Sequence, residues 1–117
     1  LEPAPTAVML RTGVEGGLPA TAGSLVDVLR ALPVGTCVIA GGAGARGLAV
    51  LLAALACGAH LRVGMADTQH YAADQPAEGN AQLIARAAGL ARIAQRPPIS
   101  PKWARTICGV PAAPGTL

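Results

Sequence analysis

Apolar positions in this chain form short unbroken runs that alternate with longer segments of helical spacing. The short runs are bounded by Gly, Pro or polar residues, which is typical of buried strands. We expect three such strands, at 6–12, 36–40 and 61–63. We expect a helix after each strand, at 25–32, 46–57 and 81–95. This βαβαβα order predicts a parallel sheet whose strands are joined by helical crossovers.

Residues that start and stop helices agree with this pattern. Thr21 or Ser24 is placed to cap the first helix, which Pro33 and Gly35 then end, and Asn80 is placed to cap the last long helix. The inner stripe of that last helix is expected to comprise Leu83, Ile84, Ala87, Leu90, Ala91, Ile93 and Ala94, with Gln82, Arg86 and Arg96 outside. The polar composition of 68–79 predicts a loop, and 103–107 is expected to form a last short helix.

The helix expected at 46–57 is apolar almost all round. A helix of this kind is usually covered on two sides. We expect one side to contact its own sheet and the other a partner subunit, which predicts a homo-oligomer. The longest apolar run, 48–57, is too short to span a bilayer, so no membrane partner is expected.

Three strands are too few to close a barrel, and as an open sheet they leave unpaired edges. The chain is therefore expected to join more sheet or to belong to a larger barrel. Residues 1–110 are expected to form one folded part and 111–117 a loose tail. The first residue is Leu1 rather than Met, which indicates a partial or processed polypeptide.

Composition narrows the class of protein. A chain of 117 residues with 52% apolar and 13% charged residues can bury one core and is not disordered. The net charge of +3 comes from scattered arginines, and aromatic residues are nearly absent, so nucleic-acid binding is not expected. Without a secretory signal pattern, the expected location is cytoplasmic. The three cysteines, Cys37, Cys57 and Cys108, lack paired spacing, which favours buried reduced thiols over disulfides or a zinc site.

A glycine-rich turn joins the second strand to its helix. Residues 42–47 match the G-x-G-x-x-G pattern, and Asp67 follows at about the distance of a ribose-binding acid. Glycines let the backbone approach phosphate, and a helix N-terminus favours negative charge. The predicted cofactor-binding residues are therefore Gly42, Gly44 and Arg46. Three interpretations stay open: a dinucleotide-binding oxidoreductase, a phosphate-binding turn of a barrel, or a tight turn that needs small residues.

Arg62 and Asp67 are the predicted catalytic residues. Arg62 lies inside an otherwise apolar strand, where a charge is costly unless it is paired. Asp67 follows the C-terminal end of the same strand, which is the end at which parallel α/β folds place their catalytic residues. The pair is interpreted as functional, with a structural ion pair as the alternative.

Other polar residues near the strand ends are weaker candidates. His60 precedes its strand and is expected to be a structural hydrogen-bonding residue. His70 and Tyr71 lie in the loop beyond Asp67, and either line a pocket or are solvated. Arg11, at the end of the first strand, and Glu15, in the loop after it, lie on the same side as Asp67; either could contact substrate, but neither is a predicted site residue.

Several segments together resemble a known family. These segments are 58–68 (Gly-Ala-His-Leu-Arg-Val-Gly-Met-Ala-Asp-Thr), Tyr71, 80–86 (Asn-Ala-Gln-Leu-Ile-Ala-Arg) and 101–109 (Pro-Lys-Trp-Ala-Arg-Thr-Ile-Cys-Gly). With the loop at 13–19 and the turn at 40–47, they resemble the C-terminal end of the β-keto acid cleavage enzymes. These are also called 3-keto-5-aminohexanoate cleavage enzymes. The resemblance runs over most of 7–110 and keeps the family's order and spacing.

The resemblance implies a fold and an activity. Members of the family are TIM barrels, so the implied fold class is α/β, with this chain forming strands 6 to 8 of a (β/α)8 barrel and their helices. They bind a divalent metal, usually zinc, and convert a β-keto acid and acetyl-CoA into acetoacetate and a new acyl-CoA. The implied partners are thus a small β-keto acid and a CoA thioester. Arg62 corresponds to the family's substrate-orienting arginine, and Asp67 to its partner in proton transfer.

Two departures from the family concern the metal. The family's metal-binding glutamate corresponds to Ala66, whose methyl group cannot bind a metal. The family's two histidine ligands come from an early strand that this chain does not contain, and His60 is not one of them. We therefore expect no metal ligand within this chain and an impaired metal site. A non-catalytic or repurposed relative and a dinucleotide-binding oxidoreductase fragment remain alternatives.

Overall fold

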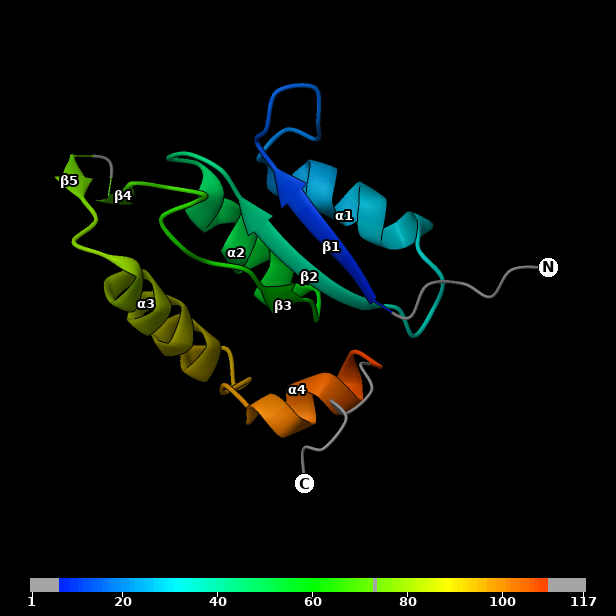
Figure 1. Cartoon of the computed structure of the whole chain (residues 1–117). Helices are drawn as coiled ribbons and strands as arrows, with labels where there is room; N and C mark the ends of the chain where they lie inside the picture. The colour runs from blue at the N-terminus through cyan, green and yellow to red at the C-terminus, as the bar shows by residue number, and fades with distance from the viewer. Residues whose placement is uncertain (1–6, 73, 110–117) are drawn as a thin grey trace.

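The computed structural model describes residues 7–72 and 74–109. Its main sheet has three parallel strands in the spatial order β1-β2-β3, namely β1 (Ala7–Thr12), β2 (Cys37–Gly42) and β3 (His60–Leu61). Figure 1 shows β1 and β2 as long neighbouring strands and β3 as a short one. The predicted parallel sheet is therefore confirmed, with a third strand that is shorter and starts one residue earlier than expected.

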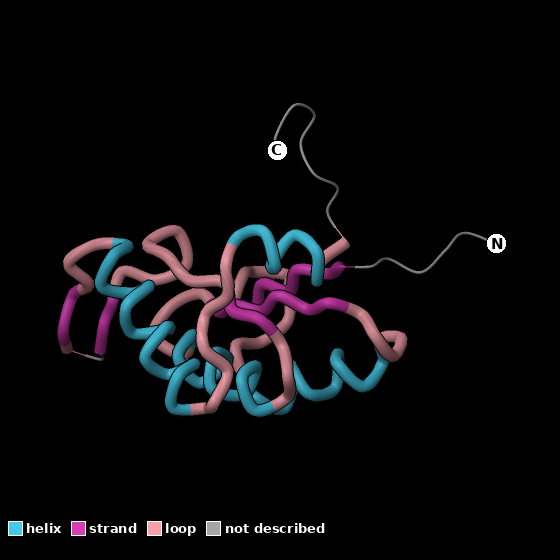
Figure 2. Tube along the Cα trace, turned by 90° about the horizontal axis from the view of Figure 1, so that it is seen from below, coloured by secondary structure: helices cyan, strands magenta, loops and turns pink. Residues whose placement is uncertain are grey.

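Four helices surround the sheet: α1 (Ala22–Ala31), α2 (Gly47–Ala56), α3 (Asn80–Ile93) and α4 (Pro101–Ile107). Figure 2 shows α1 and α2 on one side of the sheet and the short α4 on the other. The segment expected to be a loop contains a small antiparallel pair, β4 (His70–Ala72) with β5 (Gln75–Pro76). The predicted tail, 111–117, lies outside the described residues.

The core lies between the sheet and the helices α1 and α2. Its buried members are Leu25, Val38, Ala40, Val50, Ala54 and Ala59. The strand register aligns Leu10 with Ala40 and Ala40 with Leu61, so these three form one row on the helix-covered face. Because strand residues alternate between faces, the neighbouring row, which includes Arg11 and Gly41, lies on the opposite face.

The capping of α1 follows the sequence closely. The Thr21 side-chain oxygen accepts a hydrogen bond from the Ser24 backbone N–H at 3.2 Å. Thr21, rather than Ser24, is therefore the N-cap, and α1 starts at Ala22, three residues before the expected position. A side-chain acceptor at this position satisfies one of the backbone donors that a helix start leaves without a partner.

Two predictions about polar side chains of the last long helix are wrong. Asn80 is the first residue of α3 rather than its cap, and its Oδ1 accepts a hydrogen bond from the Met65 N–H at 2.7 Å. Arg96 does not point outward: its guanidinium donates to the carbonyl oxygens of Leu55, Gly58 and Ala59 at distances between 2.8 and 3.1 Å. A helix end leaves carbonyls without the usual helical partner, and this arginine donates to one such carbonyl of α2, that of Leu55, and to two in the segment that follows.

The buried stripe of α3 is also narrower than the spacing predicts. Leu83, Ala87 and Ala91 are buried, whereas Ile84 is 54% exposed and Ile93 is 79% exposed. A side chain becomes buried only where another element covers it, and the described residues place none over Ile84 or Ile93.

The apolar character of α2 is largely explained within the chain. Its buried residues pack on the strands β2 and β3, and the neighbouring helices α1 and α3 cover its flanks. Leu52 stays exposed on the outer side. Most of the apolar surface of α2 therefore has partners here, and an oligomeric partner on the remaining side stays a prediction.

The three cysteines are free, as expected, but only Cys37 is buried; Cys108 is half-buried and Cys57 is exposed. The Sγ atoms of Cys37 on β2 and Cys108 after α4 lie 2.9 Å apart. Burial raises the pKa of Cys37 to about 11, and the adjacent Cys108 thiol acts in the same direction. This contact links α4 to the sheet.

The described residues form a small α/β unit with an open parallel sheet. Within them, β1 and β3 each pair only with β2, so the sheet is not closed into a barrel. Among the same residues, no helix is both long and apolar enough to cross a membrane.

Candidate functional site

The predicted pair of Arg62 and Asp67 is present, and a second arginine joins it. Arg62 Nε lies 3.1 Å from one carboxylate oxygen of Asp67, and Arg11 Nε lies 2.7 Å from the other. The Asp67 side chain is only 4% exposed, against 38% for Arg11 and 33% for Arg62. Each oxygen of a largely buried carboxylate is thus paired with its own guanidinium, while both arginines reach solvent.

Strand register explains why the two arginines meet one carboxylate. Arg11 is aligned with Gly41 on β2, and the Arg62 N–H donates to the Ala40 carbonyl, so Arg62 continues β3 beside Gly41. The two arginines therefore flank Gly41 on the same face of the sheet, at its C-terminal end. A Cβ on Gly41 would lie 2.8 Å from the Arg62 carbonyl oxygen and 3.1 Å from its Cβ. The glycine thus lets Arg62 pack closely against β2.

The backbone turn that carries Asp67 is held from several directions. The N–H groups of Asp67 and Thr68 both donate to the Gly64 carbonyl, at 3.1 and 3.2 Å. The Gly44 N–H donates to the Asp67 carbonyl at 2.9 Å, and Asn80 accepts from the Met65 N–H. The loop after β2 and the start of α3 thus position the aspartate.

The glycine-rich turn uses much of its own backbone within the protein. The Ala43 N–H donates to the Thr12 carbonyl at 2.8 Å, and the Gly47 N–H donates to the Gly44 carbonyl at 3.1 Å. A Cβ on Gly42 would lie 2.8 Å from the Gly47 Cα, so these glycines let α2 pack closely on β2. Three of the turn's amides, including that of Gly44, are therefore engaged, which supports the tight-turn interpretation. Cofactor binding by Gly42, Gly44 and Arg46 stays a prediction.

The residues present do not fit the metal site that the resemblance implies. Ala66 is exposed and carries no ligand atom, and its carbonyl accepts a hydrogen bond from Arg11 Nη2 at 3.1 Å. Both carboxylate oxygens of Asp67 already face guanidinium groups. Across 7–72 and 74–109, no three His, Cys, Asp or Glu side chains gather as metal ligands would.

In the described part of the chain, the other polar residues considered from the sequence, namely His60, His70, Tyr71 and Glu15, do not form hydrogen bonds with the cluster of Arg11, Arg62 and Asp67. Arg86 on α3 donates to the Tyr71 carbonyl, and its guanidinium lies 5.1 Å from the centre of the Tyr71 ring. Tyr71 is therefore tied to α3, whereas His70 and Glu15 are exposed. His60 lies on β3 beside an apolar cavity, and among the described residues no hydrogen bond links it to Asp67.

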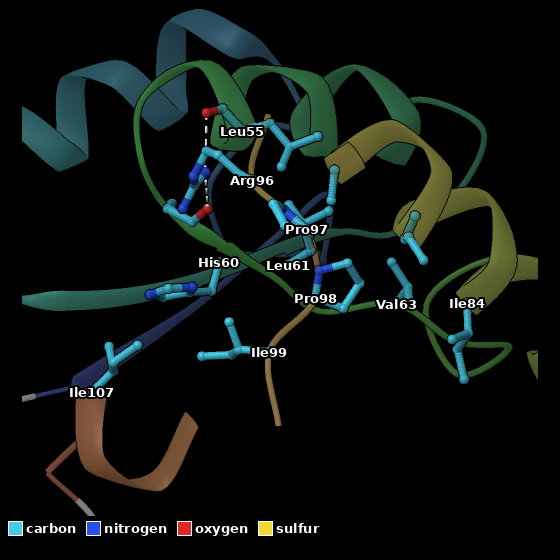
Figure 3. Close-up of a pocket in the computed structure, with 14 residues that line it drawn as sticks. Leu55, His60, Leu61, Val63, Ile84, Arg96, Pro97, Pro98, Ile99 and Ile107 are labelled. Carbon is cyan, nitrogen blue, oxygen red and sulfur yellow. Dashed lines mark hydrogen bonds between the residues drawn. The ribbon is translucent and has the colours of Figure 1, made fainter. Parts of the chain in front are cut away.

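That cavity, of about 540 Å³, lies beside β3 and α3. Figure 3 shows its walls, to which Leu61, Val63, Ile84, Pro98, Ile99 and Ile107 contribute. The only charged side chain among its described walls is Arg96, whose hydrogen bonds to carbonyls are dashed in Figure 3. The walls of this cavity thus carry few polar groups, and the cluster of Arg11, Arg62 and Asp67 lies elsewhere.

Arg11 belongs to the cluster, although it was not among the site residues predicted from the sequence. It lies 56 positions before Asp67, and no local motif connects the two. The feature of the sequence that could have indicated this contact is the position of Arg11 in its strand. Arg11 is the next-to-last residue of β1, so it lies at the sheet edge at which Asp67 follows β3.

Comparison with known proteins gives a consistent assignment. A curated relative, the 3-keto-5-aminohexanoate cleavage enzyme of Acetoanaerobium sticklandii, is 31% identical over 98 residues, which is 84% of this chain and 36% of that protein. The chain thus spans little more than a third of the length of that relative. The family model described as beta-keto acid cleavage enzyme matches residues 1–110, and the chain belongs to this family.

Proposed function

We propose that this chain carries part of the active site of an acyl-transferring enzyme. The reaction converts a β-keto acid and acetyl-CoA into acetoacetate and a new acyl-CoA. The observation that supports it most is the buried Asp67 carboxylate between Arg11 and Arg62, at the C-terminal end of a parallel sheet. Catalytic groups of parallel α/β folds gather at this end. Membership of the family supports the same class of reaction.

The chemistry of this conversion has two stages, the formation of one carbon–carbon bond and the cleavage of another. Removal of a proton from the carbon between the keto and carboxylate groups of the β-keto acid creates a carbon nucleophile. This carbon attacks the acetyl group of acetyl-CoA and releases CoA as a thiolate. The thiolate then attacks the original keto carbon, and the bond from that carbon to the central carbon breaks. Acetoacetate and the new acyl-CoA leave, so every atom is accounted for.

Asp67 and Arg62 have defined roles in this scheme. The Asp67 carboxylate accepts the proton from the central carbon and later returns it, as a general base and acid. Arg62, paired with one oxygen of Asp67 and open to solvent on its outer side, orients both the carboxylate and the substrate. The burial of Asp67 keeps its geometry constant between turnovers.

We also propose that the sheet forms the last three βα units of a TIM barrel. Both outer strands of the described sheet have an unpaired edge, and the apolar cavity lies beside the edge of β3. A strand that continues the barrel would pair with β3 and cover this cavity. A homo-oligomer, with a partner on the exposed side of α2 at Leu52, and a cytoplasmic location complete the proposal.

A second candidate is a repurposed relative that keeps the anion-handling cluster without the family's metal. The observation that favours it is the donor set: Ala66 offers no ligand, and both oxygens of Asp67 are taken by arginines. Zinc titration of the parent and of Ala66→Glu separates the candidates. Stoichiometric zinc in the parent favours the metal-dependent enzyme. Zinc bound only by Ala66→Glu favours the repurposed relative.

A product assay tests the proposed reaction. The protein that carries this chain is incubated with acetyl-CoA and β-keto acids of different side chains, and acetoacetate and acyl-CoA are quantified by mass spectrometry. We expect equal amounts of both products. Asp67→Asn should lower kcat by roughly 100-fold or more, because general acid–base groups contribute about 10²–10⁴-fold. Asp27→Asn, on the exposed side of α1, is the matched control and should leave kcat unchanged.

Two outcomes contradict the proposal. One is the absence of both products with every β-keto acid tested. The other is an Asp67→Asn variant that turns over as fast as the parent.

A further inference from the structure

We propose that Arg11 is a substrate-binding residue that acts together with Arg62 to hold the carboxylate of the β-keto acid. This inference rests on the proposed function for the identity of the anion. Its structural basis is a cluster with two cations and one anion. The guanidinium groups of Arg11 and Arg62 and the carboxylate of Asp67 sum to one positive charge.

The surplus charge is available to a ligand. Asp67 is almost fully buried behind the two arginines, whereas each arginine side chain is about one-third exposed. An anion that approaches from solvent therefore meets the guanidinium groups before it meets the buried carboxylate. Guanidinium groups are well suited to planar anions, since they present several N–H donors in one plane.

Both arginines also have N–H groups that form no hydrogen bond within the described residues. Arg11 uses Nε on Asp67 and Nη2 on the Ala66 carbonyl, while Arg62 uses Nε on Asp67 and Nη1 on the weakly accepting Met9 Sδ. Among the residues that the structure describes, Arg11 Nη1 and Arg62 Nη2 have no hydrogen-bond acceptor. One N–H group from each arginine is thus available for the two oxygens of a substrate carboxylate.

The geometry also sets Arg11 apart from an ordinary surface partner. Its bond to the Ala66 carbonyl and its bond to Asp67 fix the guanidinium at two points, so little rotational freedom remains to be lost on binding. Gly41 lacks a side chain, so the Arg62 carbonyl oxygen and Cβ pack closely against β2. A ligand held by the two arginines lies next to Asp67, the proposed proton acceptor.

The test measures binding and turnover separately. Binding of acetoacetate, a β-keto acid and a product of the proposed reaction, is measured by isothermal titration calorimetry without acetyl-CoA. For Arg11→Gln we expect a Kd raised roughly tenfold to hundredfold, the usual effect of losing a hydrogen bond to a charged group. The KM for the β-keto acid should rise in parallel, while the KM for acetyl-CoA should stay unchanged. A purely structural arginine would not produce this split.

Two further variants keep the test decisive. Arg30→Gln, on the exposed end of α1, removes the same charge away from the site and should bind acetoacetate as the parent does. Arg11→Lys keeps a cation beside Asp67 but lacks the planar fork, so it should bind with intermediate affinity. If Arg11→Gln fails to fold by circular dichroism, the Arg11→Lys result decides.

The outcomes separate this inference from the proposed function. Loss of acetoacetate binding in Arg11→Gln supports the inference even if the parent forms no products. Unchanged acetoacetate binding in Arg11→Gln, or in Arg11→Lys where that variant decides, overturns it even if the parent is an active enzyme. A parent protein that does not bind acetoacetate at all also overturns it.

Discussion

The arginine cluster and the apolar cavity are opposite kinds of site on one small sheet. The cluster of Arg11, Arg62 and Asp67 occupies little volume but brings three charges together at the C-terminal strand ends. The cavity beside β3 measures about 540 Å³ but is lined mainly by aliphatic side chains and prolines. The volume of a cavity therefore does not indicate where the charged residues of this protein gather. We therefore propose that other polypeptide covers the cavity and that the cluster is the reaction centre.

The two regions also differ in how their charged residues are used. Arg96 borders the cavity, and its three hydrogen bonds go to backbone carbonyls of the last turn of α2 and of the segment that follows it. Arg11 and Arg62 are each about one-third exposed to solvent, and each has N–H groups without an acceptor among the described residues. An arginine that donates only to backbone carbonyls stabilises the fold, whereas two arginines that share one carboxylate keep a positive charge with which a ligand can pair.

The largest expected effect comes from truncating the cavity wall. In the protein that carries this chain, Ile84→Ala should lower the free energy of unfolding by about 2–5 kcal/mol, the usual cost of removing a buried aliphatic side chain. The reason is that a continuing strand of the barrel would bury Ile84. Ile93→Ala, in the same helix and outside the cavity, is the matched control and should change stability by less than about 0.5 kcal/mol. Equal effects in urea unfolding would contradict the covered-cavity interpretation.

Adding a Cβ at Gly41, where Arg62 packs against β2, should have the next largest effect. Gly41→Ala places a Cβ 2.8 Å from the Arg62 carbonyl oxygen, and overpacking of this kind costs about 1–3 kcal/mol. Turnover should fall as well, since Arg62 must move away from Asp67. Gly23→Ala, on α1 with open space around it, should be neutral or stabilising. If thermal unfolding and kcat of Gly41→Ala match the parent, the close approach of the arginines is not required.

Removing the support beneath Asp67 should have a smaller effect. Asn80→Ala leaves the Met65 N–H without its partner, which costs about 1 kcal/mol. Hydrogen exchange at the Met65 amide should accelerate and kcat should fall. Asn80→Asp keeps the acceptor atom and should preserve slow exchange. Fast exchange at Met65 in the parent itself would rule out this support.

The smallest effect concerns a residue away from both regions. Because the pKa of Cys37 is raised to about 11 in the folded protein, alkylation of this thiol should become fast only near that pH. The unfolded thiol ionises near its ordinary value of 9.0, so this residue's contribution to stability should fall as the pH rises from 9.0 to about 11. Exposed Cys57 should be labelled first at neutral pH, as peptide mass spectrometry can show. Equal labelling of Cys37 and Cys57 under those conditions would contradict its burial.

Local patterns were enough for the order of the main elements. Each strand and helix of the βαβαβα series has its own hydrophobic signal, so its position was predictable to within a few residues. The β4–β5 pair was missed because its strands are short, polar and partly made by proline. The exposure of Ile84 and Ile93 was missed because spacing marks a helix face but not what covers it.

The pairing of Arg62 and Asp67 was also predictable from the sequence, because the two residues lie five positions apart at one strand end. The contribution of Arg11, the support from Asn80 and the engagement of Arg96 were decided only by the tertiary structure. Each of these contacts depends on strand register or on the docking of one helix against another. Register and docking follow from the packing of the whole core, and no local run of residues specifies them.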